Sequence, residues 1–489
     1  MPEEKKQEGQ GSQEAKKEKP APKDEISKTH HTALVGGQEI AYTAHAGTMV
    51  LKEEDGEAKA TLFFVAYIRD GVQDVDKRPI TFSFNGGPGS SSVWLHLGLL
   101  GPQRVVLEDD GQPLPPPCKM VDNAYSLLDK TDLIFIDPVS TGYSRATEEE
   151  KAKEFHGVDK DIESVGEFIR LLTTRFHRWA SPKFLIGESY GTTRAAGLSG
   201  FLQERHGFYL NGIMLISSIL NFETAAFHPG NDMPYILFLP TFTATAWYHG
   251  QLDETLQANL RQTLAEVEDF ASGEYAEALF QGTALPAKDR ERIVEKLARY
   301  TGLSQAYIRQ TNLRIEIFRF VKELLRDGRR TVGRLDSRFT GIDRDAAGEK
   351  FEFDPSYALI QGPYTAALNH YARVDLGFES DLPYEILTDR VRPWDYGKFQ
   401  NQYVDVAETL RKAMCQNPFL KVFVANGYYD LATPYFATRY TFTHMGLEPD
   451  LYKNVSMEYY EAGHMMYIHD SSLQQLKSDL AEFIDLSLG

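Results

Sequence analysis

The pattern of apolar positions changes along this chain, and the first part of it indicates strands. Residues 60–68 (ATLFFVAYI) are dense in aromatic and β-branched residues, as expected for one of two or three antiparallel strands within residues 37–69. Short, continuous apolar runs follow, separated by long connections; they lie at residues 78–84, 131–136, 183–186, 212–216 and 421–425. Such runs are typical of strands buried on both faces of a mainly parallel sheet, so the pattern predicts an α/β fold.

A helical pattern replaces the strands between residues 222 and 397. Apolar residues recur at helical spacing in residues 252–275, 287–301 and 304–326. The strand pattern returns at residue 421, and a last helix is expected over residues 472–486. We therefore predict one domain made of residues 29–221 and 398–489, with residues 222–397 inserted as a mostly helical cap.

The first 28 residues differ from the rest in composition. They consist largely of Lys, Glu, Gln, Gly and Pro, and so little apolar surface cannot offset the entropy of ordering the chain. We predict that residues 1–28 are disordered. They contain no apolar stretch of the kind found in secretory signals, so either the protein is cytoplasmic or a signal has been removed.

Charge and cysteine content exclude several classes of function. A formal net charge of −18 over 489 residues argues against a nucleic-acid partner, whose phosphates require clustered Lys and Arg. No window approaches the eighteen or so consecutive apolar residues that span a bilayer, so we expect no membrane span. The two cysteines, Cys118 and Cys415, lack the C-x-x-C spacing of zinc or redox sites, and the sequence leaves open whether they form one bridge.

A candidate nucleophile lies in Gly187-Glu188-Ser189-Tyr190-Gly191, which fits the pattern G-x-S-x-G. The motif follows the apolar run 183–186 and precedes a helix-like stretch. The flanking positions must be small because the serine sits in a strained turn that lifts its hydroxyl above the sheet. An ordinary serine in a glycine-rich turn is the alternative. With the parallel sheet, the motif predicts an α/β-hydrolase fold that has Ser189 as nucleophile.

Two later residues suit the other roles of a catalytic triad. A serine hydroxyl needs an imidazole to take its proton and a carboxylate to orient the imidazole. In this fold the order along the chain is Ser, acid, His. Asp430 follows the buried run 421–425, and His464 follows the strand-like residues 455–460. Each alone could be a packed histidine or the start of a turn, but together they predict the triad Ser189, Asp430 and His464.

Acyl transfer also requires hydrogen-bond donors for the oxyanion. The segment Asn85-Gly86-Gly87-Pro88-Gly89 follows the strand-like run 78–84. Glycine lets a backbone amide approach the substrate closely, and the second donor in this fold is the N–H of the residue after the nucleophile, here Tyr190. A tight Gly-Pro turn without catalytic meaning is the alternative.

Taken together, these motifs resemble the serine carboxypeptidases, the carboxypeptidase Y-like peptidases of the α/β-hydrolase fold. The resemblance covers about residues 78–220 and 422–468. It rests on motifs in the same order as in the family: FNGGPGSSS (84–92) with Gly-Pro at 101–102, DLIFIDPVSTGYS (132–144), GESYG (187–191), the strand ending in Asp430, and AGHM (462–465).

The resemblance implies a serine-type carboxypeptidase that hydrolyses C-terminal peptide bonds through an acyl-enzyme. It implies that Gly87 and Tyr190 donate to the oxyanion, and that Asn85, Gly86 and Glu188 bind the terminal carboxylate of a peptide substrate. Protonation of Glu188 at acidic pH would allow it to donate to that carboxylate. No metal or organic cofactor is implied. Family members are exported, so the resemblance also implies a periplasmic or secreted protein.

Three positions depart from the family pattern. Leu99 occupies the position that usually holds a further glutamate of the carboxylate-binding network, and Ser90 replaces a usual cysteine. The segment that ends in the acid reads NGYYD, where many members have an aspartate near its start. Because of Leu99, an esterase, amidase or acyltransferase on the same triad is the alternative function. A non-catalytic binding protein is disfavoured because every catalytic position holds a competent residue.

Overall fold

One mixed sheet of ten strands forms the centre of the computed structural model, which describes residues 22–489. Its strands are β1 (Glu25–Val35), β2 (Gln38–Lys52), β3 (Ala58–Arg69), β4 (Ile80–Phe84), β7 (Asp132–Ile136), β8 (Arg145–Ala146), β9 (Lys183–Ser189), β10 (Gly212–Ser218), β13 (Lys421–Gly427) and β14 (Val455–Tyr460). In space they follow the order β1-β2-β3-β7-β4-β9-β10-β13-β14, and β8 pairs with β3 beside this path. Strands β1, β2, β3 and β7 pair antiparallel, whereas all pairs from β7 to β14 are parallel.

Helices cover both faces of this sheet because successive side chains of each buried strand point to opposite faces. In β7, Leu133 and Phe135 enter one core and Ile134 and Ile136 enter the other. The first core lies under α15 (Asp470–Leu488), α11 (Pro355–Val374) and α1 (Val93–Leu95). The second lies under α2 (Val158–Arg175), α3 (Tyr190–His206) and α12 (Ala407–Gln416). The predicted α/β class with a mostly parallel central sheet is therefore confirmed.

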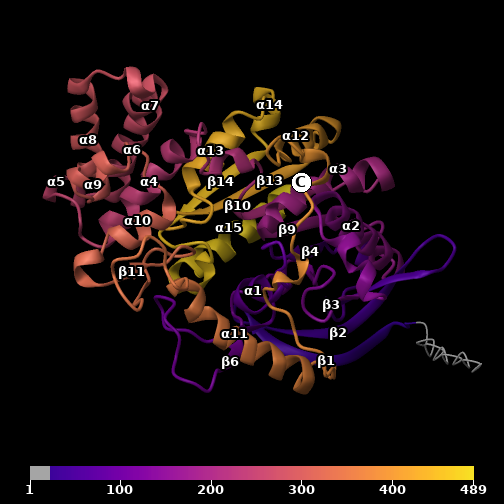
Figure 1. The fold of residues 1–489 in the computed structure, drawn as a ribbon. Coiled ribbons are helices and arrows are strands. Elements are labelled where there is room, and N and C mark those ends of the chain that lie inside the picture. Colours follow the sequence, from indigo (N-terminus) through magenta and orange to yellow (C-terminus); the bar gives the residue numbers. More distant parts are fainter. Residues whose placement is uncertain (1–21) are drawn as a thin grey trace, which may run out of the picture.

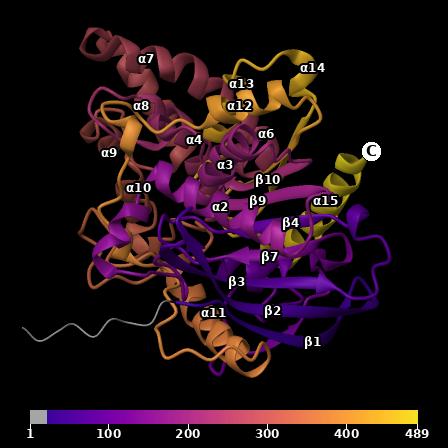
Figure 2. The same cartoon turned by 90° about the vertical axis from the view of Figure 1, so that its right-hand side faces the viewer.

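Residues 222–397, here called the insertion, enter between the neighbouring strands β10 and β13. They contain α4 (Met233–Tyr248), α5 (Glu254–Gln257), α6 (Leu260–Phe270), α7 (Ala276–Gln281), α8 (Ala287–Thr301), α9 (Gln305–Gln310), α10 (Ile317–Glu323) and α11, together with the short strands β11 (Thr331–Val332) and β12 (Thr340–Gly341). Figures 1 and 2 show α7, α8 and α9 gathered at the upper left, away from β1 and β2. The division into a catalytic domain and a cap stays a prediction.

The insertion has its own core, and that core continues into the sheet domain. Its helices bury leucine and phenylalanine side chains together with Tyr428, Tyr429 and Tyr435, which follow β13. Tyr428 and Tyr435 contact each other edge to face, with ring centroids 5.0 Å apart. The insertion therefore packs directly against the residues that surround Asp430.

Two of the predicted helices are interrupted in the structure. Residues 304–326 form α9 and α10, separated by Asn312 and Leu313, which have positive φ angles of 59° and 66°. Residues 252–275 divide in a similar way, because the Asn259 side chain accepts a hydrogen bond from the Gln262 amide and begins α6. Asparagine favours such local side-chain bonds at helix starts, and hydrophobic periodicity does not detect them.

Most of the predicted disordered tail, residues 1–28, lies outside the described residues, although β1 already begins at Glu25. Across residues 22–489, every helix is too short or too polar to cross a membrane. Cys118 and Cys415 are both free thiols, which answers the question that the sequence left open.

Candidate active site

Ser189 is the last residue of β9 and stands at the start of α3 with φ 61° and ψ −129°. A positive φ is rare for a residue with a side chain and is maintained only where the surroundings impose it. The flanking glycines permit this turn. A Cβ on Gly187 would lie 2.2 Å from the carbonyl oxygen of Gly191, and a Cβ on Gly191 would lie 2.7 Å from that of Phe84. The turn therefore presents Ser189, partly exposed, at the carboxyl edge of the sheet.

Asp430 and His464 meet at the same edge. Strands β13 and β14 are parallel neighbours with Gly427 opposite Tyr460, so the loops that follow them emerge side by side. The Nδ1 atom of His464 lies 2.7 Å from Oδ2 of Asp430, and both side chains are buried. The predicted acid and base are thus in direct hydrogen-bonding contact.

Neighbouring groups fix both members of this pair. Oδ1 of Asp430 accepts hydrogen bonds from the amides of Ala432 (2.7 Å) and Thr433 (3.0 Å), and the Thr433 hydroxyl donates to Oδ2 (2.7 Å). The Ser217 hydroxyl at the end of β10 donates to the His464 carbonyl oxygen at 2.6 Å. The carboxylate is therefore held with one oxygen toward the imidazole.

The environment of His464 favours its protonated form. Burial lowers the pKa of His464, but the charge and hydrogen bond of Asp430 outweigh this effect, and the pKa is raised above its usual value. A neutral imidazole with a raised pKa is a stronger base, so this histidine suits removal of a proton from a hydroxyl.

The glycine segment after β4 lies against the turn at Ser189. Strand β4 pairs with β9, with Phe84 opposite Gly187. A Cβ on Gly86 would lie only 2.3 Å from the amide nitrogen of Tyr190, and Gly87 has a φ of 103°. This close approach is open to glycine alone, and it brings the backbone of the segment beside the Tyr190 amide.

Glu188 forms a buried cluster with Asn85 and Tyr467 beside the serine. Nδ2 of Asn85 donates to Oε1 of Glu188 at 3.0 Å, and the Tyr467 hydroxyl donates to Oε2 at 2.6 Å. Burial raises the pKa of Glu188 to about 7, although His464 and the hydrogen bonds from Tyr467 and Asn85 oppose the shift. Leu99, in contrast, is fully buried in the apolar core and offers no polar side-chain atom.

Sequence reasoning missed Tyr467, Thr433 and Ser217. Tyr467 lies in the 3-10 turn Met466–Ile468, so its hydroxyl returns to Glu188, which is 279 positions away in the sequence. No local motif marks these residues. Two other histidines near His464 in the sequence have different partners: Nδ1 of His444 contacts the Tyr440 carbonyl at 2.7 Å, and Nδ1 of His469 contacts the Ser472 hydroxyl at 2.8 Å.

A buried ion pair joins α3, α2 and the glycine segment. Nε and Nη2 of Arg194 donate to the two carboxylate oxygens of Asp161 at 2.7 and 3.1 Å, and Nη1 donates to the Asn85 carbonyl at 2.6 Å. Both side chains are almost fully buried. Arg194 therefore fixes the backbone that leads into Gly86 and Gly87.

Replacing Arg194 by methionine is expected to lower the free energy of unfolding by about 3–5 kcal/mol, because Asp161 is left as an unpaired buried charge. Chemical denaturation measures this. Arg170→Met is the matched control, since its pair with Glu167 is more than a third exposed on both sides and is worth at most about 1 kcal/mol. Equal losses of unfolding free energy in Arg194→Met and Arg170→Met would contradict the conclusion that Arg194 neutralises a buried charge.

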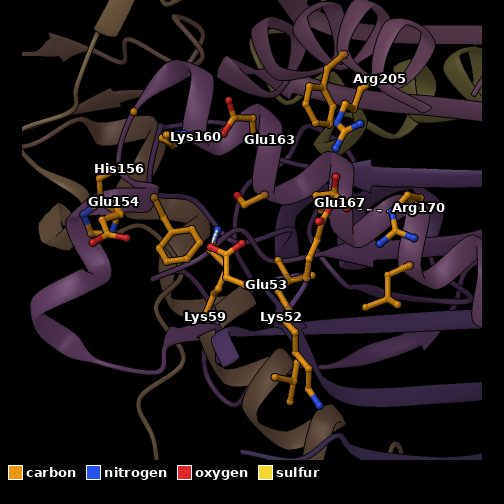
Figure 3. Close-up of a pocket in the computed structure, with 18 of the residues that line it drawn as sticks. Lys52, Glu53, Lys59, Glu154, His156, Lys160, Glu163, Glu167, Arg170 and Arg205 are labelled. Atoms are coloured by element: carbon orange, nitrogen blue, oxygen red, sulfur yellow. Dashed lines mark hydrogen bonds and ion pairs between the residues drawn. The ribbon is translucent and has the colours of Figure 1, made fainter. Parts of the chain in front are cut away.

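A groove of about 1160 Å³ lies away from these residues (Figure 3). It runs along α2, between the end of β2, the start of β3 and the end of α3. Many of its charged side chains are paired with one another, as in Lys59 with Glu53 and Lys160 with Glu163. None of the candidate site residues lines it.

No group of three or more His, Cys, Asp or Glu side chains within residues 22–489 is arranged to hold a metal ion.

Comparisons with known proteins point to one family. The family model described as serine carboxypeptidase matches residues 37–476. The pheromone-processing carboxypeptidase KEX1 of Yarrowia lipolytica is 29% identical over 36% of this chain and 26% of its own length. The serine carboxypeptidase-like protein 34 of Arabidopsis thaliana is 26% identical over 39% of this chain and 38% of its own length. The chain thus aligns with well under half of these curated relatives.

Among solved structures, a prohormone-processing carboxypeptidase, KEX1, from Saccharomyces cerevisiae superimposes with a TM-score of 0.56. The match covers 91% of each chain at 16% identity. At this identity the match shows a shared α/β-hydrolase architecture.

Proposed function

Because the chain belongs to the serine carboxypeptidase family, we propose that it is a serine-type carboxypeptidase that removes the last residue of peptides. One observation carries the proposal: a buried carboxyl group, Glu188, directly precedes Ser189 and is hydrogen-bonded by Asn85. Together, Glu188 and Asn85 are suited to bind a carboxylate one residue from the scissile bond.

The proposed reaction begins with Ser189. Its Oγ attacks the scissile carbonyl carbon while Nε2 of His464 takes the hydroxyl proton, and Asp430 stabilises the imidazolium that forms. The amides of Gly87 and Tyr190 donate to the oxyanion. His464 then gives the proton to the leaving amine, which departs as the released amino acid. Water, activated by His464, hydrolyses the acyl-enzyme and frees Ser189.

Recognition of the terminal carboxylate depends on the protonation of Glu188. Below its raised pKa of about 7 the side chain is neutral and donates a hydrogen bond, while above that pKa it carries a charge that repels the substrate. Asn85 and the Gly86 backbone are the neighbouring groups in this proposed subsite. The Tyr467 hydroxyl holds the second oxygen of Glu188.

A second candidate, an esterase, amidase or acyltransferase on the same residues, is favoured by Leu99. Its side chain is apolar and fully buried, so this position supplies no carboxyl group to the subsite. The fold hosts many acyl-transfer reactions, and a weakened carboxylate subsite would leave the triad without exopeptidase selectivity.

The deciding experiment compares a blocked dipeptide that has a free carboxylate with its C-terminal amide, across about pH 5 to 9. We divide kcat/KM for the substrate with a free carboxylate by kcat/KM for its amide. This ratio should fall about tenfold per pH unit above pH 7, because only protonated Glu188 binds the carboxylate. Taking the ratio cancels the titration of His464, which affects both substrates alike. In Glu188→Gln, which stays neutral, the ratio should no longer change with pH.

A ratio near one at every pH, with both substrates cleaved, would contradict the carboxypeptidase proposal and favour the second candidate. A ratio that still falls above pH 7 in Glu188→Gln would assign the titration to another group.

Peptides are the proposed substrates, and export from the cytoplasm is proposed on the same family resemblance. The support for both is membership of the serine carboxypeptidase family. Fractionation of cells that produce the full-length protein tests this, and recovery only with cytoplasmic markers would contradict it.

A further inference from the structure

A segment of the insertion lies between the two loops that carry Asp430 and His464. This segment, residues 334–338 (Arg-Leu-Asp-Ser-Arg), connects the short strands β11 and β12. It forms backbone hydrogen bonds with residues at or next to both side chains: Leu431 N to Arg334 O at 3.1 Å, His464 N to Leu335 O at 2.7 Å, and Ser337 N to Tyr429 O at 2.9 Å. Residues 334–338 therefore bridge the Asp430 loop and the His464 loop.

The side chain of Asp336 adds a fourth hydrogen bond, to the residue directly before His464. Its Oδ2 accepts a hydrogen bond from the Gly463 amide at 3.2 Å, directly before His464. A Cβ on Gly463 would lie 2.4 Å from Asp336 on one side, while a Cβ on Gly427 would lie 2.3 Å from the Gly463 carbonyl oxygen on the other. Gly463 is thus held closely between the insertion and the end of β13.

Arg338 fixes the carboxylate that makes this bond. Nη2 of Arg338 lies 2.7 Å from Oδ2 of Asp336, and Nε lies 3.0 Å from Oδ1. The pair is almost fully buried. Such a bidentate contact sets the orientation of a carboxylate as well as its position. The oxygen that receives the Gly463 amide is therefore not free to rotate away.

Residues 334–338 are themselves anchored on two helices of the insertion. Asp354 at the start of α11 accepts the amide hydrogens of Arg334 (3.0 Å) and Leu335 (3.3 Å). At the end of α4, Nε2 of His249 contacts the Ser337 carbonyl at 2.7 Å. Hydrogen bonds to both helices therefore fix the position of residues 334–338.

We propose that Asp336 is a positioning residue for catalysis, which holds the Gly463-His464 backbone so that the imidazole stays aligned between Asp430 and Ser189. The insertion then contributes to the alignment of the catalytic residues. The inference rests on the proposed roles of Ser189, Asp430 and His464. A displacement of about 1 Å in such an arrangement costs roughly 100-fold in rate.

The test uses Asp336→Asn in the full-length protein. The amide keeps the size of the side chain but removes the charge that holds Arg338. We expect the rate of Ser189 labelling by a fluorophosphonate, and kcat for a peptide, to fall about tenfold to 100-fold while KM changes less than threefold. The downfield proton NMR signal of the His464 Nδ1–H shared with Asp430 should shift or broaden.

Two further variants separate positioning from stability. Asp343→Asn disrupts another buried ion pair of the insertion, with Lys322, which does not touch the loops of Asp430 and His464. It should lower the Tm but leave the labelling rate and the NMR signal within twofold of the wild type. Asp336→Asn combined with Arg338→Met removes the unpaired buried charge, so it should regain Tm yet still label slowly.

A folded Asp336→Asn protein that labels at the wild-type rate with an unchanged NMR signal would overturn the inference. So would a double variant whose labelling rate recovers together with its Tm. Failure of the proposed roles of Ser189, Asp430 and His464 would look different, because then the wild-type protein itself would not be labelled, or Ser189→Ala would be labelled equally. Failure of the carboxypeptidase proposal alone would appear in the acid-to-amide ratio of the wild type and would leave the labelling unchanged.

Discussion

Replacing Ser189 by alanine is expected to reduce kcat for peptide hydrolysis by about 10⁴- to 10⁶-fold. The substitution removes the proposed nucleophile, while the proposed oxyanion donors and His464 remain and can still assist attack by water. Alanine also keeps the Cβ atom, so the backbone strain of the positive φ at this position is unchanged. Steady-state kinetics on a peptide with a free carboxylate and fluorophosphonate labelling both measure the loss.

Ser199→Ala is the matched control for this experiment. Ser199 is a buried serine of α3, the same helix that follows the nucleophile, and its hydroxyl donates only to the Ala196 carbonyl at 2.6 Å. Its removal should leave kcat within about threefold of the wild type. A Ser189→Ala protein that retains more than about one hundredth of the wild-type kcat would assign the nucleophile to another residue.

The sheet could be predicted because its strands are buried on both faces. A strand covered on both sides is apolar over most of its length, and β7, β9 and β10 contain the unbroken apolar runs 133–136, 184–186 and 213–216. The antiparallel edge was predicted from the aromatic residues of β3. Each observed strand of this set lies within a few residues of its prediction.

The contact between Asp430 and His464 could also be predicted, because motif order and strand direction constrain it. Both residues follow parallel strands, so their loops had to reach the same edge of the sheet. The strained turn at Ser189 likewise follows from the glycines on either side. These inferences use information that is local in the sequence, namely a motif, a strand and the direction of the chain.

The surroundings of the site could not be predicted, because their contacts join residues that are far apart in sequence without a motif. Tyr467 reaches Glu188 across 279 positions, and Asp336 reaches the Gly463 amide across 127. The hydroxyl or carboxylate that makes such a contact is determined by how the chain packs around the site. Hydrophobic periodicity carries no information on this packing. The raised pKa of Glu188 depends on the same packing, since burial is its main cause.

Replacing Asp430 by asparagine is expected to lower kcat by about 10⁴-fold with little change in structure. The Asn carbonyl oxygen can still accept hydrogen bonds from the backbone amides of Ala432 and Thr433, which donate to Oδ1 in the wild type. The NH₂ group then faces Nδ1 of His464, where the wild type has an acceptor oxygen. Nδ1 becomes the hydrogen-bond acceptor, so Nε2 carries the proton and cannot take one from Ser189.

The pH profile provides a second readout for Asp430→Asn. In the wild type the charge of Asp430 raises the pKa of His464, so activity that needs neutral His464 is lost as the pH falls through this raised pKa. Without that charge the pKa of His464 should fall, because burial disfavours the protonated imidazole, and the acid limb should move to lower pH. Thr433→Val is the matched control, because it removes one hydroxyl bond to Asp430 but keeps the carboxylate, and we expect a loss of about tenfold or less. If Asp430→Asn kept kcat within tenfold and left the acid limb in place, the orienting carboxylate would have to be another residue.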